Sequence, residues 1–451
     1  MASFHTQYKP LLDFYPERSV VPVFTTDDEL KELDSRRTRF VEKPTVGVRH
    51  PGYPAYANPL LSFPAVDHDG VDYDLAIHAC YLLVGNAWPR DGSPSHEAPY
   101  LSYSDRPRES APESVITPPA TGDTVIRRTS YLHVPSYTGR GPYPITPSFD
   151  HWEFPHAFDA PPAPSDSGGN GPLVPPPETP PRPFLPAAWR AAAIAAAPSP
   201  SDLTGRLGIL ARDQTCRVTQ YGMGVEAAHL VPKKAQPWFT LNSMKWYAKT
   251  PDDVNAIDDM NNLLLLRADI HYMLDCRELI IVPKKLEDRY VFVLKVIKSK
   301  KRYLYDAYEI YHNRICQDFL GVRIEYLFAR FAWSIFHPET LPIVLTPNFK
   351  YPVRVYDATA KSYQVQDRLM SEFRKERSLS TGGSNKRPRS SGLVDYDAYS
   401  AYSDNTLASS EFGDSDEDSY EERLCSMDIY NERLSGEGEE HRGRKRSRKK
   451  S

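Results

Sequence analysis

Residues 225–234 read VEAAHLVPKK, and residues 261–276 read NNLLLLRADIHYMLDC. The first stretch is a short apolar run that ends at His229, and the second contains four consecutive leucines, so each predicts a β-strand. The segment after the leucines is amphipathic and predicts a short helix. A strand, a second strand and a helix in this order would bring His229, Asn262 and His271 toward one another.

The spacing of His271 and Asp275 predicts a metal-binding pair. Residues four positions apart share one face of a helix, with their Cβ atoms about 6 Å apart. An imidazole and a carboxylate so placed can hold one divalent cation, and the hard carboxylate oxygen suits Mg²⁺ or Mn²⁺. His229 has two interpretations, a packed core residue or a base beside solvent, and the strand pattern alone does not choose between them.

The combined pattern resembles the HNH nucleases of the ββα-metal, or His-Me finger, superfamily, and most closely the fungal HNH-domain proteins. The resemblance is carried by AAHLVP, by the Asn-x8-His-x3-Asp spacing and by IIVPK, and it covers about residues 211–285. It implies that His229 is the general base, that Asn262 orients the loop carrying it, and that His271 binds the catalytic metal ion. Asp275 is expected to serve as the second metal ligand.

The resemblance implies a metal-dependent endonuclease that hydrolyses DNA phosphodiester bonds, with RNA left open as a substrate. A neutral imidazole, with a reference pKa near 6.5, can accept a proton from water at neutral pH. A positioned base of this kind contributes about 10²- to 10⁴-fold in rate. The expected cofactor is one Mg²⁺ or Mn²⁺ ion, which offsets negative charge that develops on the phosphate group.

The chain departs from the family pattern at two places. Many members carry Asp or His immediately before the base as a further metal ligand, whereas this chain has Ala228. Many members also hold a structural zinc ion in two C-x-x-C pairs, but Arg267 and Ile270 stand where the second pair would fall, so we expect no structural zinc. Ala228 keeps an alternative open, namely a catalytically weak or inactive domain that serves as a nucleic-acid or protein interaction module.

Basic and aromatic side chains around the predicted strands are candidates for contacting the substrate. We expect Lys233, Lys234, Lys284 and Lys285 to bind phosphates, since such contacts supply most sequence-independent affinity for nucleic acids. Lysines in such positions are also commonly just solvated. Four aromatic residues between the strands either stack on bases or anchor the loop against the core; they are Trp238, Phe239, Trp246 and Tyr247.

Composition divides the 451-residue chain into four parts. Residues 1–103 form a small module of unknown role, and residues 104–186 form a proline-rich linker, because their last 26 residues contain 11 prolines. We expect residues 187–363 to form the HNH nuclease domain that the resemblance implies, with a C-terminal helical extension, and residues 364–451 to form a disordered tail. The expected fold class is α+β, a ββα-metal core with added helices and strands, flanked by disordered segments.

The tail carries segregated charge that predicts a nuclear protein. Residues 411–440 contain twelve acidic residues against two arginines, and the last eleven residues contain seven Lys or Arg. A second basic cluster, NKRPRSS, occupies residues 385–391, so a nuclear import receptor is an expected partner. The alternative is a tail that only improves solubility. Five scattered cysteines favour a reducing compartment, and no apolar stretch is long enough to predict a membrane partner.

Overall fold

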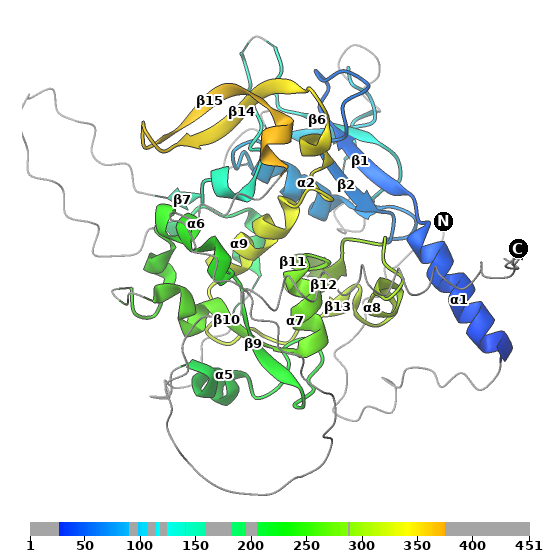
Figure 1. The fold of residues 1–451 in the computed structure, drawn as a ribbon, viewed down its shortest axis with the longest axis vertical. Coiled ribbons are helices and arrows are strands. Elements are labelled where there is room, and N and C mark those ends of the chain that lie inside the picture. Colours follow the sequence, from blue (N-terminus) through cyan, green and yellow to red (C-terminus); the bar gives the residue numbers. More distant parts are fainter. Residues whose placement is uncertain are drawn as a thin grey trace, which may run out of the picture. The chain divides into compact units, whose positions relative to one another are not determined.

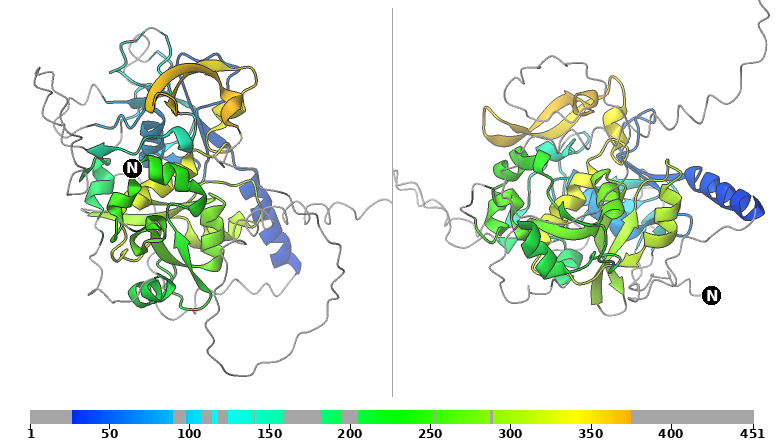
Figure 2. Two further views of the ribbon diagram at one scale, coloured as in Figure 1. Left: turned by 60° about the vertical axis from the view of Figure 1, so that its left-hand side comes forward. Right: turned by 60° about the horizontal axis from the view of Figure 1, so that its bottom comes forward.

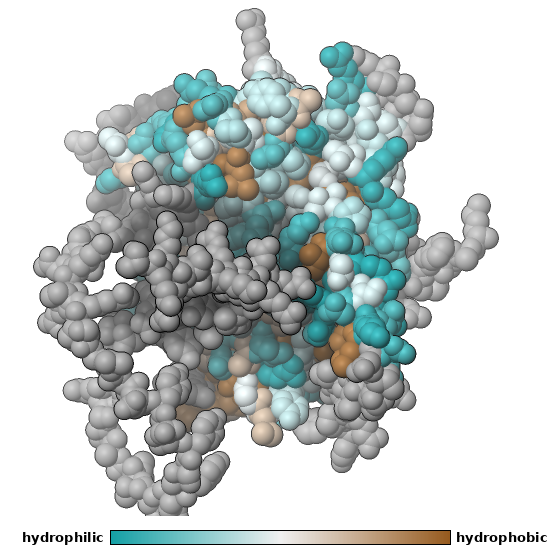
Figure 3. All heavy atoms as spheres, turned by 45° about the vertical axis from the view of Figure 1, so that its right-hand side comes forward, coloured by the Kyte–Doolittle hydropathy of each residue, from teal (hydrophilic) through white to brown (hydrophobic). Residues whose placement is uncertain are grey.

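The computed structural model describes residues 27–89, 98–106, 114–117, 124–139, 141–157, 182–192, 194, 205–251, 253, 255–286 and 289–374. The chain divides into two units, Met1–Ser380 and Thr381–Ser451, and every described residue belongs to the first. None of the helices in these ranges combines the length and apolar composition that crossing a bilayer requires. On the face shown in Figure 3, hydrophilic side chains predominate and hydrophobic atoms form small separate patches.

The segment predicted as strand, strand and helix has those elements in that order. Strand β9 (Val225–His229) pairs antiparallel with β10 (Leu263–Arg267), with His229 opposite Leu263. Helix α7 (Ala268–Asp275) follows β10 directly. We call β9, β10 and α7 the hairpin–helix segment.

The leucines of β10 are buried on both faces of the strand, which explains an unbroken apolar run instead of an alternating one. Leu264 and Leu266 point into the main core. Leu263 and Leu265 pack with Ile209 in a second, small core. Ile209 comes from α5 (Gly205–Asp213), which lies beside β10 (Figure 2).

Helix α9 (Ile324–Ile335) packs against elements from several parts of the unit. Every residue from Glu325 to Ile335 is buried, as is typical of a helix covered on all sides. It packs against strand β11 (Leu279–Leu286) and helix α2 (Tyr73–Leu83), as Figure 1 shows, and it also contacts helix α4 (Ala187–Ala191). The helical extension is interrupted before α9, where Gly321 adopts a left-handed φ of 65°.

The remaining strands form one four-stranded sheet, one three-stranded sheet and three two-stranded pairs among the described residues. The first sheet has the order β2-β1-β6-β4, the second has the order β11-β12-β13, and β14 pairs with β15. The other bounds are α1 Asp27–Val41, β1 Thr45–Arg49, β2 Leu61–Pro64, β3 Val71–Asp72, β4 Tyr100–Ser102, β5 Val125–Ile126, β6 Ser130–His133, η3 Phe149–His151, β7 His156–Ala157, β8 Arg182–Pro183, η4 Lys233–Ala235, α6 Gln236–Leu241, η5 Met244–Tyr247, η6 Ala256–Asp258, η7 Met260–Asn262, β12 Arg289–Val296, α8 Leu304–Tyr311, β13 Arg314–Ile315, η8 Pro342–Leu345, β14 Lys350–Asp357, β15 Ser362–Leu369 and η9 Met370–Phe373.

The linker predicted for residues 104–186 is wrong for much of its length. Described residues within it form β5, β6 and β7, and Trp152 is completely buried. Its ring stacks on that of Trp238, with centroids 5.4 Å apart, and meets Phe328 edge-on at 5.8 Å. The prolines concentrate in residues 161–186, whereas the residues before them carry aromatic side chains that bury apolar area in the shared core. Trp238 therefore anchors its loop against the core.

The end predicted for the folded part, at residue 363, is also wrong. Strand β15 continues to Leu369, and η9 follows it with Met370 fully buried. The structure is described up to residue 374, so the acidic block and both basic clusters of the tail lie outside the described residues.

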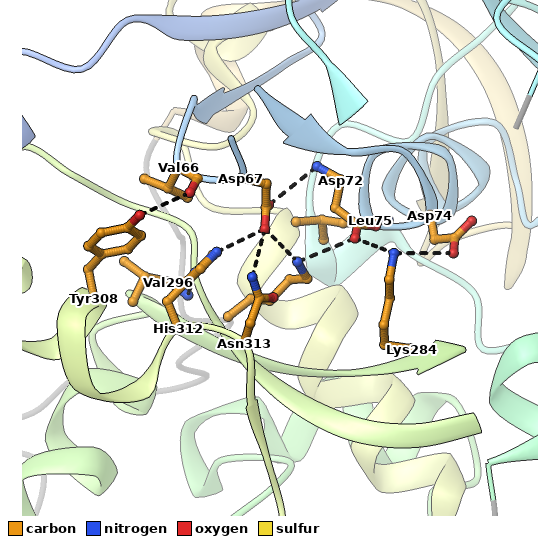
Figure 4. Close-up of polar contacts among 11 residues, drawn as sticks. Val66, Asp67, Asp72, Asp74, Leu75, Lys284, Val296, Tyr308, His312 and Asn313 are labelled. Atoms are coloured by element: carbon orange, nitrogen blue, oxygen red, sulfur yellow. Dashed lines mark hydrogen bonds and ion pairs between the residues drawn. The ribbon is translucent and has the colours of Figure 1, made fainter. Parts of the chain in front are cut away.

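A buried ion cluster joins the N-terminal region to the strands that follow α7, so residues 1–103 are not a separate module. Its members are Asp67, Asp72, Lys284, Lys295, His312 and Asn313, each no more than 7% exposed (Figure 4). The ammonium of Lys295 lies 3.0 Å from the carboxylate of Asp67 and 3.4 Å from that of Asp72. The ammonium of Lys284 lies 2.6 Å from Asp72. Because an unpaired buried charge is strongly destabilising, each region supplies charges that the other needs in the folded protein.

Candidate active site

His229 ends β9 with its imidazole partly open to solvent. Its side chain is 22% exposed, and its Nε2 lies 2.7 Å from Oδ1 of Asp258, the last residue of η6. The hydrogen bond with His229 lowers the pKa of Asp258, partial burial opposes this, and the positive charge of Lys233, 3.4 Å away, adds to the lowering. The histidine is therefore not sealed in the core but held by a carboxylate.

The contact with Asp258 assigns a role to each ring nitrogen of His229. An ionised carboxylate only accepts hydrogen bonds, so Nε2 carries the ring hydrogen and donates a hydrogen bond to Asp258. The other nitrogen, Nδ1, then keeps its lone pair and is the atom that can accept a proton. Sequence reasoning missed Asp258; its only signal was the acidic pair Asp258–Asp259 shortly before Asn262, and acidic pairs are common in loops.

Asn262 is fully buried and clamps the chain that follows the histidine. Its Oδ1 accepts from the backbone N–H of Val231 at 2.8 Å, and its Nδ2 donates to the carbonyl of Val231 at 3.0 Å. The same Nδ2 donates to the carbonyl of Ile257 at 2.7 Å, next to Asp258. The amide thus ties the loop carrying the histidine to the loop carrying its carboxylate partner, without a group that titrates.

His271 lies between two carboxylates on the hairpin–helix segment. Its Nε2 is 3.1 Å from Oδ2 of Asp275, one turn along α7, and its Nδ1 is 2.9 Å from Oε2 of Glu226 on β9. Burial works against protonation of His271, but its hydrogen bonds to Asp275 and Glu226 and their negative charges outweigh burial and raise its pKa. Glu226 was missed by sequence reasoning; it is the one charged residue within the apolar run of β9.

The pair of His271 and Asp275 fits a divalent metal ion. Neighbouring ligand atoms of an octahedral ion with bonds of about 2.1 Å lie about 3.0 Å apart, close to the 3.1 Å between Nε2 and Oδ2. The contact of Nδ1 with Glu226 matches the carboxylate that usually supports a metal-binding histidine. No group of three or more His, Cys, Asp or Glu in the described ranges is arranged to hold a metal. Water and phosphate oxygens would complete the coordination, as is usual for Mg²⁺.

Asp275 is ionised, and both of its carboxylate oxygens face positively charged or hydrogen-bonding partners. Burial alone would raise its pKa, but the positive charge of Arg330 and the contact with His271 outweigh burial and hold its pKa well below the ordinary value. Its two carboxylate oxygens have different partners, because Oδ1 accepts from Arg330 and Oδ2 faces His271.

Residues 213–282 match the family model of the HNH endonucleases. This part of the chain is an HNH domain. HNH domains are nuclease-type domains that act on nucleic acids and generally use a divalent metal ion, and the matched range contains His229, Asn262, His271 and Asp275. No curated protein and no solved structure matches the chain.

The four predicted phosphate-binding lysines do not gather at one place around the HNH domain. Lys233 and Lys234 are exposed and lie four and five residues after His229, and the Lys234 ammonium lies 5.0 Å from the ring centroid of Trp333. Lys284 is only 2% exposed and pairs with Asp72, so its prediction as a phosphate ligand is wrong. Lys285, beside it on β11, is half-buried.

Ala228 is fully buried within the HNH domain. Because neighbouring side chains of a strand point to opposite faces, it points away from the side where His229 meets Asp258. Ala228 therefore adds no polar atom to the side of the hairpin that carries His229.

Proposed function

We propose that this protein is a metal-dependent HNH endonuclease that hydrolyses DNA phosphodiester bonds, with His229 as the general base. The observation that carries the proposal is the convergence of two units within one HNH domain: the His229–Asp258 pair and the His271–Asp275 pair. They are linked through Arg330, which contacts the backbone carbonyl of His229 and the carboxylate of Asp275. A base and a metal site joined through one guanidinium suit the hydrolysis of one phosphodiester bond.

The proposed reaction is attack of water on the phosphorus atom, with departure of a sugar oxygen. Nδ1 of His229 takes the proton of the attacking water, and Asp258 stabilises the positive charge that then forms on the imidazole. Asn262 keeps the histidine aimed, and Lys233 and Lys234 bind flanking phosphates. His271 and Asp275 would hold a divalent ion, which when bound would supply electrostatic stabilisation for the negative charge on the phosphate and the leaving oxygen.

Plasmid nicking by the purified full-length chain in Mg²⁺ or Mn²⁺ tests this proposal. We expect His229→Ala to lower the nicking rate by about 10²- to 10⁴-fold. His68→Ala, at an exposed histidine in a turn, is the matched control and should leave the rate unchanged. Nicking by His229→Ala at the unchanged rate would exclude His229 as the general base. A single-stranded RNA substrate in a parallel assay compares the cleavage rates of DNA and RNA.

A weak or inactive interaction module is the second candidate, and one observation favours it. Ala228 supplies no ligand, and Asp275 already pairs with Arg330 at 2.6 Å, so the metal site has two protein ligands instead of three. Equal DNA affinity of the native protein and His229→Ala, with no cleavage in Mg²⁺, Mn²⁺ or Zn²⁺, would support this candidate over the enzyme.

We also propose that the protein is nuclear and binds an import receptor through its basic tail clusters. The support is the sequence alone, residues 385–391 and 441–451. A fluorescent fusion should concentrate in the nucleus, and removal of both clusters should spread it through the cell. Unchanged nuclear accumulation after removal would overturn this assignment.

A further inference from the structure

Arg330 of α9 reaches the site from outside the segment that matches the HNH family. Its Nη2 donates to Oδ1 of Asp275 at 2.6 Å. Its Nη1 donates to the backbone carbonyls of His229 and Leu230 at the longer distances of 3.4 and 3.5 Å. One guanidinium therefore makes a short contact with the metal-binding helix and two weaker contacts with the strand end that carries the base.

The side chain of Arg330 is buried against an aromatic ring of its own helix. Its side chain is 2% exposed, and its guanidinium lies 4.5 Å from the ring centroid of Trp333, one turn along the helix. Its Nε is buried and has no hydrogen-bond partner among the residues that the structure describes. A buried ion pair is commonly no more stable than an apolar side chain of similar volume, so an arginine with an unsatisfied N–H at this place points to a role beyond stability.

The contacts of Arg330 complement those of Asn262. The backbone N–H groups of Leu230 and Val231 donate to Asn262, through its carbonyl and its Oδ1. The carbonyls of His229 and Leu230 accept from Arg330. The short segment after the base is thus fixed by its N–H groups from one residue and by its carbonyls from another.

We propose that Arg330 is a positioning residue of the active site, which sets the distance between the general base on β9 and the metal ligand Asp275 on α7. This rests on the proposed function of the HNH domain. Arg330 is too deeply buried to touch a substrate, so it acts through these two elements. The planar fork of a guanidinium can hold both at a fixed separation, whereas an ammonium can hold only one. Helix α9 is then part of the catalytic unit.

Arg330→Met and Arg330→Lys in the full-length chain test the proposal, with three readouts. We expect Arg330→Met to lower kcat for plasmid nicking at saturating Mn²⁺ by about 10²-fold, since a small misplacement of reacting groups has that effect. The KM for DNA should stay within about twofold, because the DNA-binding lysines are untouched. Arg330→Lys should recover only part of the loss.

Titration calorimetry of Mn²⁺ binding, without DNA, distinguishes a positioning role of Arg330 from the effect of its positive charge. Removal of a positive charge beside the metal ligands would by itself strengthen binding of a cation. We expect Arg330→Met to bind Mn²⁺ about tenfold more weakly, because loss of a supporting partner costs that much. Tighter binding in this variant would mean that Arg330 competes with the metal for Asp275, and it would overturn the proposal.

Arg314→Met is the matched control for loss of a buried arginine. Arg314 is 6% exposed, and its Nε donates to the carbonyl of Ile310, at the end of α8. It should change thermal unfolding without changing Mn²⁺ affinity or the kcat of the folded fraction. If Arg330→Met does not fold, Arg330→Lys and Arg330→Gln carry the test, and unfolding of all three counts against the proposal.

The two proposals fail in different ways. A native protein that binds Mn²⁺ but does not nick DNA contradicts the proposed nuclease, while the Mn²⁺ titration of the variants still decides the role of Arg330. A native protein that nicks DNA, with kcat and Mn²⁺ affinity of Arg330→Met unchanged within twofold, contradicts the positioning role alone.

Discussion

His229 is positioned by two residues, one that contacts its ring and one that contacts the chain just after it. Asp258 accepts a hydrogen bond from Nε2 of the ring, and Asn262 binds the backbone of Val231, two residues further along. The neighbouring Asn261 does a different job, because its Nδ2 donates to the carbonyl of Tyr247 in another part of the loop. Adjacent asparagines therefore differ in function because successive side chains point in different directions.

Asp258→Asn should slow the reaction without unfolding the protein. The amide oxygen can still accept from Nε2 of His229, but it has no charge to stabilise the imidazolium, so we expect kcat to fall on the order of 10²-fold. Single-turnover nicking measures this change. Asp253→Asn, on the same loop, is the control, since Asp253 accepts from the backbone of Asn255. Equal rates for both variants would show that Asp258 has no part in the chemistry.

Mn²⁺ affinity should rise with pH through the raised pKa of His271. Its ordinary value is 6.5, and Asp275 and Glu226 outweigh burial to raise it in the folded protein. Below the raised pKa a proton occupies the ring and must leave before a metal binds, so affinity falls as pH decreases. Calorimetric titrations at pH 6, 7 and 8 test the sign. Glu226→Gln should weaken the pH dependence, because it removes one cause of the raised pKa.

At the scale of elements, the hairpin–helix segment depends on its surroundings. A two-stranded hairpin alone is only marginally stable in water. Here β10 is covered on one side by α5 and on the other by the main core, and α7 packs against β10 and β11. The family match ends at residue 282, yet the folded unit that supports it runs from residue 27 to residue 374.

Leu264→Ala should destabilise the protein strongly. The side chain is completely buried in β10, so its loss removes apolar contacts and leaves a cavity, at a cost of about 2–5 kcal/mol in the free energy of unfolding. Leu207→Ala on α5 is the matched control, because Leu207 is 65% exposed and its loss should stay within about 0.5 kcal/mol. Urea unfolding measures both. Similar costs for the two variants would contradict this placement of β10 in the core.

At the scale of the whole molecule, the buried ion cluster connects parts of the chain far apart in sequence. Asp67 receives contacts from Lys295, His312 and Asn313, all more than 200 residues away. The ring of His312 accepts from the backbone N–H of Val296 through Nδ1, so its Nε2 donates to Asp67. The charges of this cluster are paired in only one arrangement of the two regions, so the cluster stabilises that arrangement.

Asp67→Asn should destabilise the protein at neutral pH and flatten its acid denaturation. Burial alone would raise the pKa of Asp67, but Lys295 and His312 outweigh it and hold the pKa well below 3.8. The unfolded state therefore binds the proton more readily, so this contribution is complete above 3.8 and is lost as pH falls toward the folded pKa. The loss at pH 7 should be about 3–5 kcal/mol, since Lys295 keeps its charge in a buried site.

Unfolding free energies at pH 7, 5, 4 and 3 check the magnitude and the sign. Asp28→Asn is the control, because the Asp28 side chain is 94% exposed in its pair with Lys31 and contributes little. A native protein and an Asp67→Asn variant with the same pH dependence would contradict the role of the cluster in acid stability.

The local features of the site could be predicted from short stretches of sequence. The order of two strands and a helix, and the four-residue step from His271 to Asp275, follow from periodicity and from hydrogen bonds between near neighbours, which a short stretch specifies. The same kind of reading failed for residues 104–186, because proline content averaged over the stretch concealed the aromatic side chains that pack in the core.

Which side chains meet at the site depends on long-range packing and could not be predicted from the sequence. Asp258, Glu226 and Arg330 complete the site from a loop, a strand and a helix whose approach no local pattern encodes. Lys284 and Lys233 look alike in the sequence, yet one is buried against a carboxylate 212 positions away and the other is exposed beside the histidine. Exposure and charge pairing depend on what packs over a residue, and that is settled by contacts between distant parts of the chain.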